Sequence, residues 1–347
     1  EGLMELGHEP ILIGPGDSNV ACKVLPSVEK ALWFPRRKAE QAAYNKELRA
    51  AMQSTFHLVK SVQNKVDIIH SHGVDMLPFK RFPNVTTLHG PVVFDEISYY
   101  LRRLNLNYIC ISNNQTKVLP SLNTIGVVYN GLKPEEFPFI KRPKNYVTFI
   151  GRFDREKNPH LAIKLAIALG IKIKLAGKID YLGDGYFEEE VEPYLKHPLV
   201  EYLGEIGMEE KIELLKNAKC NFHPTGFREP FGLTVLEAAY CGTPTLAISR
   251  GSMPELIKDG QTGVLVEDFE EGLEAFDRAV NLDRRHISEH ARQTFNYLNM
   301  TKGYIGLYEK VIRDFGYRHS WLNRFRSWLG SNPTYRHHHG RTVKTKA

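Results

Sequence analysis

Short apolar runs rich in β-branched residues alternate with amphipathic stretches along most of the chain. This alternation is typical of parallel β-strands joined by crossover helices. In the first part, strands are predicted at 10–14, 66–70, 84–88, 106–112 and 125–129. Helices are predicted between them at 37–63, near 93–104 and at 112–118. The first part is therefore predicted to form an α/β unit.

A stretch rich in Pro, Glu and Lys at 134–144 interrupts this alternation and is the predicted linker. Beyond it, strands are predicted at 146–151, 171–176, 200–203, 218–223, 245–248 and 263–266. Helices are predicted at 158–169, 184–196, 208–217, 231–241, 253–258, 268–281 and 283–297. We predict two doubly wound, Rossmann-like domains, 1–138 and 139–299, whose parallel sheets face a cleft. Ligands of such sheets bind at the carboxyl ends of the strands.

Length and composition agree with two globular domains. A chain of 347 residues exceeds the size at which a single hydrophobic core stops growing. No apolar run reaches the roughly 18–20 residues of a membrane span. The four cysteines, Cys22, Cys110, Cys220 and Cys241, show no CxxC spacing and are predicted to be buried, reduced thiols. These features predict a cytoplasmic protein.

The positive charge is concentrated at the end of the chain. After Asp314 there are seven Lys or Arg residues and no Asp or Glu, so residues 1–314 carry a net charge of −1 within the total of +6. A nucleic-acid-binding domain needs a basic face on the folded domain itself, and we therefore exclude this class. Residues 300–314 are predicted to form a helix that returns to the N-terminal domain, and residues 315–347 a basic tail.

The tail contains apolar residues at the i, i+1, i+4, i+7, i+8 spacing of one helix face. They are Trp321, Leu322, Phe325, Trp328 and Leu329, with Arg318, Arg324 and Arg326 nearby. A cationic amphipathic helix of this kind lies on anionic membranes. Peripheral membrane contact through residues 315–330 is therefore one hypothesis. Packing across the first domain and a free chain end are the alternatives.

The strongest chemical signal lies where a predicted strand is followed by a loop and a helix. There Glu229 and Glu237 stand eight residues apart, around Phe231, Gly232 and Leu233. A helix that begins near Phe231 presents the free amides of these three residues to a ligand, and a diphosphate is stabilised at such a terminus. A carboxylate on a buried helix face needs a partner, and a ribose hydroxyl can provide one to Glu237. Capping and solvation of the helix by the two acids is the plainer alternative.

This element resembles the E-x7-E motif of glycosyltransferase family 4, whose members are retaining enzymes of the GT-B fold. Seven further segments resemble that family in order and approximate spacing: 14–18 (GPGDS), 87–91 (TLHGP), 129–131 (YNG), 151–152 (GR), 156–158 (EKN), 205–207 (EIG) and 251–255 (GSMPE). The resemblance covers nearly the whole chain and points to a bacterial branch that includes avilamycin-type sugar transferases. It implies an α/β protein of the GT-B fold that transfers a hexose with retention.

The resemblance implies two catalytic residues, Glu229 and His89. Glu229 would contact sugar hydroxyls or stabilise positive charge at the anomeric carbon. His89 follows a predicted strand and would project into the cleft beside the transferred sugar. A single histidine after a strand is more often structural, so the resemblance decides this assignment.

The resemblance also implies a set of donor-binding residues. Arg152 and Lys157 would converge on the diphosphate and take up charge as the leaving group departs. Glu237 would bind the ribose. The amides of Phe231, Gly232 and Leu233 would complete the diphosphate site. For Lys157 taken alone, a solvated loop cation is an equal alternative.

No cofactor or catalytic metal ion is implied, because Arg, Lys and helix amides take up the charge that a magnesium ion takes elsewhere. His70 and His72 alternate on one face of a strand end, but no third ligand has the spacing of a zinc site. The expected donor is a UDP- or GDP-linked hexose. The expected acceptor is a small molecule, a glycan or a lipid.

The start of the chain departs from the family pattern. Members begin with a strand and a Gly-rich loop, whereas Glu1 aligns inside the helix that follows them. We expect the chain as given to lack a central strand of the first sheet and to be poorly stable or inactive as a transferase.

Two other functions stay open, namely a GT-B-fold nucleotide-sugar epimerase and a catalytically inactive relative that acts as a binding module. The fold alone does not choose among them. The presence of Glu229, Glu237, Arg152 and His89 favours the transferase.

Overall fold

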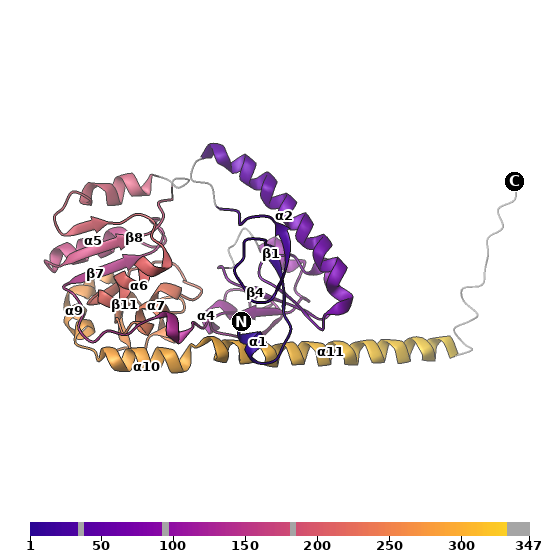
Figure 1. Ribbon diagram of the computed structural model, residues 1–347. Coiled ribbons are helices and arrows are strands. Elements are labelled where there is room, and N and C mark those ends of the chain that lie inside the picture. The colour runs from indigo at the N-terminus through magenta and orange to yellow at the C-terminus, as the bar shows by residue number, and fades with distance from the viewer. Residues whose placement is uncertain (34–37, 92–96, 181–184, 332–347) are drawn as a thin grey trace.

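The computed structural model describes residues 1–33, 38–91, 97–180 and 185–331, which form two lobes and a long helix (Figure 1). The first lobe holds the strands up to β6 (Thr124–Val127), and the second lobe those from β7 (Tyr146–Ile150) to β12 (Gly263–Val266). All paired strands are parallel, which confirms the predicted α/β class.

The second lobe is built on a six-stranded sheet with the order β12-β11-β10-β7-β8-β9. Its remaining strands are β8 (Lys172–Ala176), β9 (Val200–Tyr202), β10 (Cys220–His223) and β11 (Thr245–Ile248). Because β7 lies beside β10, the direction of strand order reverses between these two strands. In a doubly wound sheet a ligand crevice opens at this reversal.

Helices cover both faces of this sheet. One face packs against α5 (Pro159–Ala168) and α9 (Gly272–Val280). The other packs against α6 (Met208–Asn217), α7 (Leu233–Tyr240), α8 (Met253–Leu256) and α10 (Arg284–Thr294). Side chains alternate accordingly, since Leu246 contacts the first group of helices and Ala247 the second. Strands β7, β10 and β11 in the middle of this sheet are buried almost throughout, as is typical of parallel sheets covered on both faces.

The predicted α-helix at 184–196 is wrong in type. The structure has a π-helical turn, η6 (Phe187–Val191), followed by a 3₁₀ turn, η7 (Glu192–Tyr194). Pro193 explains the break, because proline lacks the amide that an α-helix needs at that point. Residue 184 lies outside the described residues.

The first lobe contains two separate parallel sheets. One has the order β3 (Ile69–Ser71), β4 (Asn84–Leu88), β5 (Tyr108–Cys110) and β6, and the other pairs β1 (Ile11–Pro15) with β2 (Lys23–Val28). The prediction missed β2 because Pro26 interrupts its pattern, and a proline is tolerated only where no ladder bond is needed. All five β1 residues are only half-buried, whereas all five β4 residues are buried.

Two layers of helices enclose the larger sheet of the first lobe. On one face, Val59 of α2 (Gln41–Val62) packs with Tyr108 and Cys110. On the other face, Val85 and Ile109 pack against the long C-terminal helix, α11 (Tyr297–Ser331). Two short helices, α3 (Ile97–Leu101) and α4 (Asn113–Thr116), complete this lobe, and α1 (Gly2–Glu5) lies against α11. Residue 37 and residues 93–96, where two predicted helices begin, lie outside the described residues.

The chain crosses between the lobes twice, and the two crossings are paired. The amide of Leu132 donates to the carbonyl of Phe295 (3.0 Å), and the amide of Tyr297 donates to the carbonyl of Leu132 (3.1 Å). A Cβ at Gly131 would collide with the backbone of Asn296, so only glycine permits this approach. The crossings therefore form one hydrogen-bonded connection.

α11 is one continuous helix where a helix at 300–314 and a separate tail were predicted (Figure 1). Its first half packs on the first lobe through Tyr304 and Val311. The backbone stays helical to Ser331, but the side chains from 317 onward lie outside the described residues, and the predicted amphipathic face is among them. No helix in the described ranges is long and apolar enough to cross a bilayer.

Candidate functional site

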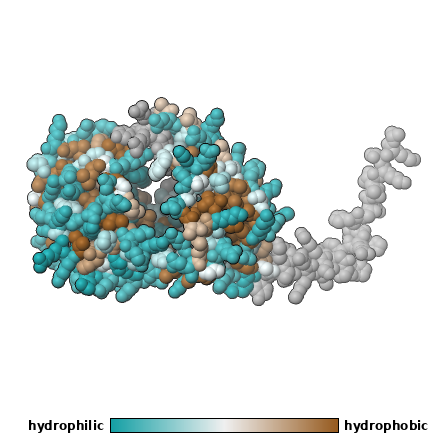
Figure 2. Space-filling view, viewed as in Figure 1, coloured by the Kyte–Doolittle hydropathy of each residue, from teal (hydrophilic) through white to brown (hydrophobic). Residues whose placement is uncertain are grey.

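The two lobes border a hollow on the face shown in Figure 2. A cavity of about 240 Å³ lies on this boundary. Its lining comes from both lobes: Pro91, Asn114, Gln115 and Val118 from the first, and Glu156, Phe227, Arg228 and Pro230 from the second. These residues lie in segments that follow β4, β5, β7 and β10, so the predicted cleft at the carboxyl ends of the two sheets is present.

The loop after β7 carries Arg152 and Lys157. The guanidinium of Arg152 is half exposed and pairs with Asp154 (2.9 Å) and Glu156 (2.9 Å). The backbone amide of Lys157 donates to the Asp154 carboxylate (2.9 Å), which fixes the end of the loop. The Lys157 ammonium lies over the ring of Phe227 (5.0 Å). The loop thus presents two cations from one strand end.

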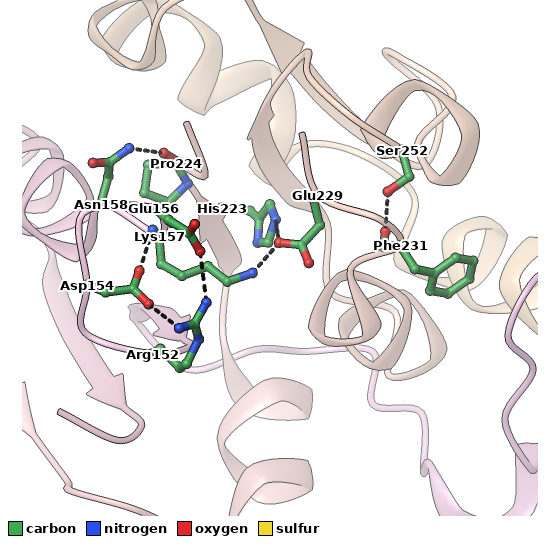
Figure 3. A network of polar contacts seen from close by, with 10 residues as sticks. All are labelled: Arg152, Asp154, Glu156, Lys157, Asn158, His223, Pro224, Glu229, Phe231 and Ser252. Carbon is green, nitrogen blue, oxygen red and sulfur yellow. Dashed lines mark hydrogen bonds and ion pairs between the residues drawn. The ribbon is translucent and has the colours of Figure 1, made fainter. Parts of the chain in front are cut away.

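The loop after β10 carries Glu229, and Lys157 forms an ion pair with it. Both side chains are largely buried, at 16% exposure for Lys157 and 12% for Glu229. Figure 3 shows Lys157 and His223 pointing toward the Glu229 carboxylate. The His223 Nε2 atom lies 3.9 Å from the Glu229 Oε2 atom and has no hydrogen-bond partner among the described residues. Burial, and secondarily the charge of Lys157, lowers the pKa of His223 to about 3, so the imidazole is neutral.

The loops after β7 and β10 are joined by further bonds. Asn158 adopts a left-handed backbone (φ 51°) and its side chain donates to the carbonyl of Pro224 (3.1 Å). The amide of Gly226 donates to the carbonyl of Glu156 (3.0 Å). Asparagine tolerates this backbone better than most residues. The two loops therefore hold Lys157 and Glu229 together as one unit.

The helix after Glu229 begins two residues later than predicted. α7 starts at Leu233, with Gly232 as its N-cap in a left-handed conformation (φ 97°). The amides of Gly232 and Leu233 stay at the helix terminus, whereas Phe231 precedes it. The Phe231 ring is buried against Tyr129 and Phe295. The positive φ takes Gly232 out of the α-helical region, so the helix begins after it, and a Cβ there would lie 2.6 Å from the Met253 side chain, so the position requires glycine.

Glu237 lies on the inner face of α7 and is 4% exposed. Its Oε1 atom accepts a hydrogen bond from Lys211 of α6 (2.6 Å), whereas Oε2 is buried with no partner among the described residues. Burial raises the pKa of Glu237, and Lys211 only partly opposes this effect. Glu229 and Glu237 therefore belong to two separate lysine–glutamate pairs. A buried carboxylate oxygen without a donor is costly to the folded state.

The predicted acceptor side contains a group of three histidines in the first lobe. His89 follows β4, and its Nε2 atom lies 2.8 Å from Nδ1 of His72. His70 contacts Tyr308 of α11 (2.6 Å) and Thr87 (2.7 Å) through its two ring nitrogens. Burial lowers the pKa of all three imidazoles, to about 3 for His70 and about 4 for His72. The contact described for His89 is thus within its own lobe, not with the second-lobe candidates.

Replacing His70 by glutamine is expected to flatten the loss of stability in acid. The lowered pKa of His70 means that between pH 6.5 and about 3 the folded state binds fewer protons than the unfolded state. The stability linked to the neutral ring is complete above pH 6.5 and is lost as the pH falls through that window, by up to about 1.4 kcal/mol per pH unit. Urea unfolding at pH 7, 6 and 5 measures this slope. His57→Gln, at an exposed position on α2, is the control, and equal slopes for His70→Gln and wild type would contradict the prediction.

Several residues at the site were not predicted from the sequence. His223 was the last residue of a predicted strand, at the end where ligands bind, and this position could have identified it. Lys211 lies four residues from Gly207, on a separate helix that no motif connects to Glu237. Ser252, whose hydroxyl donates to the carbonyl of Phe231 (2.5 Å), lies in the 251–255 segment, and the sequence alone indicates no role for it. Among the described residues, no three His, Cys, Asp or Glu side chains converge in a way that could hold a metal ion.

Comparison with known proteins finds a family match over part of the chain. Residues 133–294 match the family described as Glycosyl transferases group 1. The D-inositol 3-phosphate glycosyltransferase of Mycobacterium marinum is 28% identical over 207 residues, covering 53% of this chain and 41% of that protein. The glycogen synthase of Mycobacterium tuberculosis is 26% identical over 239 residues, covering 57% of this chain and 56% of that protein. The matched region thus spans about half the length of these curated relatives.

Solved structures resemble nearly the whole chain. A glycosyltransferase involved in avilamycin A biosynthesis has a TM-score of 0.67 at 20% identity, covering 90% of this chain and 87% of its own. Sucrose-phosphate synthase from Thermosynechococcus elongatus has a TM-score of 0.66 at 18% identity, covering 93% and 91%. Anabaena HepE in complex with UDP-glucose has a TM-score of 0.59 at 16% identity, covering 86% of each chain. At these identities the similarity establishes the fold alone. The chain therefore has the two-domain GT-B fold, and its residues 133–294 match the Glycosyl transferases group 1 family.

Proposed function

We propose that this chain transfers a hexose, with retention at the anomeric carbon, from a UDP- or GDP-linked donor to an acceptor. The observation that carries the proposal is the convergence of Arg152, Lys157, Glu229 and the start of α7 at the point where strand order reverses in the second lobe. Two cations and a helix N-terminus beside a carboxylate suit a diphosphate next to a sugar. The HepE structure with UDP-glucose supports a nucleotide-sugar donor for this fold.

The diphosphate would exchange partners with the carboxylates that now hold the cations. Arg152 is half exposed, and among the described residues its ion pairs are with Asp154 and Glu156 of its own loop, so it can swing toward a phosphate. Lys157 would move from Glu229 to the leaving diphosphate, where it neutralises the charge that develops. We propose that this arrangement takes the place of a divalent metal ion. Turnover that persists in excess EDTA would support this, and turnover that requires added magnesium would contradict it.

Glu229 and His89 would act on the sugar from opposite lobes. Once Lys157 engages the diphosphate, the Glu229 carboxylate is released toward the sugar hydroxyls and the anomeric carbon, next to neutral His223. His89 would contact the transferred sugar from the acceptor side. Glu237 would bind the ribose, since a hydroxyl can donate to the carboxylate oxygen that lacks a partner. Neither the family match nor the relatives named above favour the alternative epimerase.

A nucleotide panel tests the donor site directly. UDP, GDP, ADP and dTDP are added separately, and the melting temperature is measured. A ligand at one hundred times its Kd stabilises the fold by about 2.7 kcal/mol. We expect a shift with UDP or GDP, followed by release of that nucleotide from its hexose conjugate, with the α-anomer preserved in the product by NMR. No shift with any nucleotide at millimolar concentration would contradict the proposal.

Contact of the basic tail with an anionic membrane is a separate part of the proposal, based on the sequence of residues 315–330 alone. Flotation of the whole chain and of a 1–314 truncation with anionic vesicles tests it. Equal flotation of the two proteins would contradict membrane contact through the tail.

A further inference from the structure

The side chain of Glu255 connects the two lobes. Glu255 lies in α8 of the second lobe, yet its carboxylate accepts hydrogen bonds from the first lobe. The donors are the amides of Asn113 (2.7 Å) and Asn114 (2.7 Å), the Asn113 side chain (3.0 Å) and the Tyr129 hydroxyl (2.8 Å). Both carboxylate oxygens are used. Four donors on one carboxylate make a strong and directional contact.

The same short segment also holds the loop that carries Glu229. The amide of Ser252 donates to the carbonyl of Glu229 (3.0 Å), and the Ser252 hydroxyl donates to the carbonyl of Phe231 (2.5 Å). Gly251 has a positive φ of 64°, and a Cβ there would collide with the backbone of Glu229. Residues 251–255 therefore contact the Glu229 loop at one end and the first lobe at the other.

On the first lobe, the contact continues to the segment that carries His89. Gln115 lies in the same turn of α4 as Asn113 and Asn114. Its side-chain amide donates to the carbonyls of Leu88 (3.0 Å) and Gly90 (2.8 Å), the two residues that flank His89. Its carbonyl oxygen accepts from the amide of Ile111 (2.9 Å). Hydrogen bonds, linked through the short segments 252–255 and 113–115, thus join the backbone at Glu229 to the backbone on both sides of His89.

We propose that Glu255 is a positioning residue that fixes the separation of Glu229 and His89 across the cleft. The inference rests on the proposed function for the roles of those two residues, but the contact between the lobes is independent of it. Reacting groups held on two lobes depend on the geometry of closure, and a misplacement of about 1 Å can cost about 10²-fold in rate. The donor nucleotide would contact only the second lobe, so its affinity should not depend on Glu255.

Glu255→Gln and Glu255→Ala test the proposal. The glutamine side chain has one acceptor oxygen and one NH₂ donor in place of two acceptor oxygens. It therefore cannot accept hydrogen bonds from the amides of both Asn113 and Asn114. Spin labels at Lys60 on α2 and Asp277 on α9, in a Cys22→Ser background, report the distance between the lobes. We expect both variants to broaden this distance distribution and to lower kcat by at least about tenfold. UDP affinity should stay within about twofold of wild type.

Two further variants sharpen the result. Tyr129→Phe removes one of the four donors and should give a smaller change of the same kind. Glu274→Gln removes an exposed carboxylate from α9 and should leave both the distances and kcat unchanged. An unchanged distance distribution in Glu255→Ala would overturn the proposal, and so would broadened distances with full kcat. If wild type releases no nucleotide from any donor, the proposed function fails, and the label distances alone then decide whether Glu255 holds the lobes together.

Discussion

Replacing Lys157 by methionine is expected to lower turnover of the nucleotide-sugar donor by about 10²- to 10³-fold. The ammonium group lies in a largely buried position, between Glu229 and the Phe227 ring. In the proposed reaction, negative charge develops on the departing diphosphate, and a cation fixed in a partly desolvated site stabilises this charge more than a solvated one does. Methionine keeps the unbranched side chain as far as the Cε position and removes the charged group. Steady-state kcat and KM for nucleotide release measure the effect.

The stability of the same variants separates charge loss from misfolding. Lys157→Met leaves Glu229, at 12% exposure, without its cation, so the free energy of unfolding should fall. Adding Glu229→Gln removes the isolated charge and should restore most of that stability while the protein stays inactive. Lys164→Met, at an exposed position on α5, is the matched control and should change neither property. Wild-type turnover in Lys157→Met would contradict the assignment.

A third observable reports the site without any substrate. The charge of Lys157 is the second cause, after burial, of the lowered pKa of His223. In Lys157→Met this pKa should therefore rise from about 3, and an NMR titration of the ring can follow it. An unchanged pKa would show that Lys157 does not lie beside His223 in solution.

The fold was largely predictable because hydrophobic patterns define the buried strands. β4, β11 and β12 have the predicted limits, and each is buried on both faces or nearly so. The pattern failed where another constraint dominated. Pro26 concealed β2, Pro193 broke a predicted α-helix, and the backbone of Gly232 delayed the start of α7. A pattern also could not show that the helix at 300–314 continues unbroken to Ser331.

The candidate site was predictable in its residues but not in its pairings. The motif located Glu229 and Glu237, but their partners, Lys157 and Lys211, stand 72 and 26 residues away in the sequence. Glu255 meets Asn113 across 142 positions, and only the tertiary fold brings them together. The position of His89 after a strand predicted that it lies at the cleft. Its contact with His72 could not be predicted, because it depends on the ends of β3 and β4 lying side by side. Sequence patterns indicate local structure and burial. These pairings join residues that are far apart in the sequence, so such patterns cannot reveal them.

Replacing Glu237 by glutamine is expected to weaken nucleotide binding by about 10- to 100-fold without lowering the melting temperature at pH 7. A hydrogen bond to a charged group contributes about 1.5–3 kcal/mol, and the proposed ribose contact loses its charged acceptor. The fold itself gains, because burial raises the pKa of Glu237 and ionisation is therefore unfavourable there. Lys211, which loses its partner, is one-fifth exposed and can reach solvent. Calorimetric titration with UDP or GDP and thermal unfolding measure the two effects.

The pH dependence of stability shows why Glu237→Gln should be at least as stable as wild type at neutral pH. With a raised pKa, the folded state of wild type holds a proton that the unfolded state has released above its ordinary pKa of 4.5. The stability linked to the protonated carboxyl is present below pH 4.5 and is lost as the pH rises through the folded pKa. Glutamine does not titrate, so Glu237→Gln should lack this decline and should exceed wild type most at neutral pH. Glu209→Gln, at an exposed position on α6, controls for removal of a charge. A variant that is clearly less stable than wild type at pH 7, yet binds the nucleotide equally well, would assign Glu237 to the structure of α7 and α6 and not to the donor site.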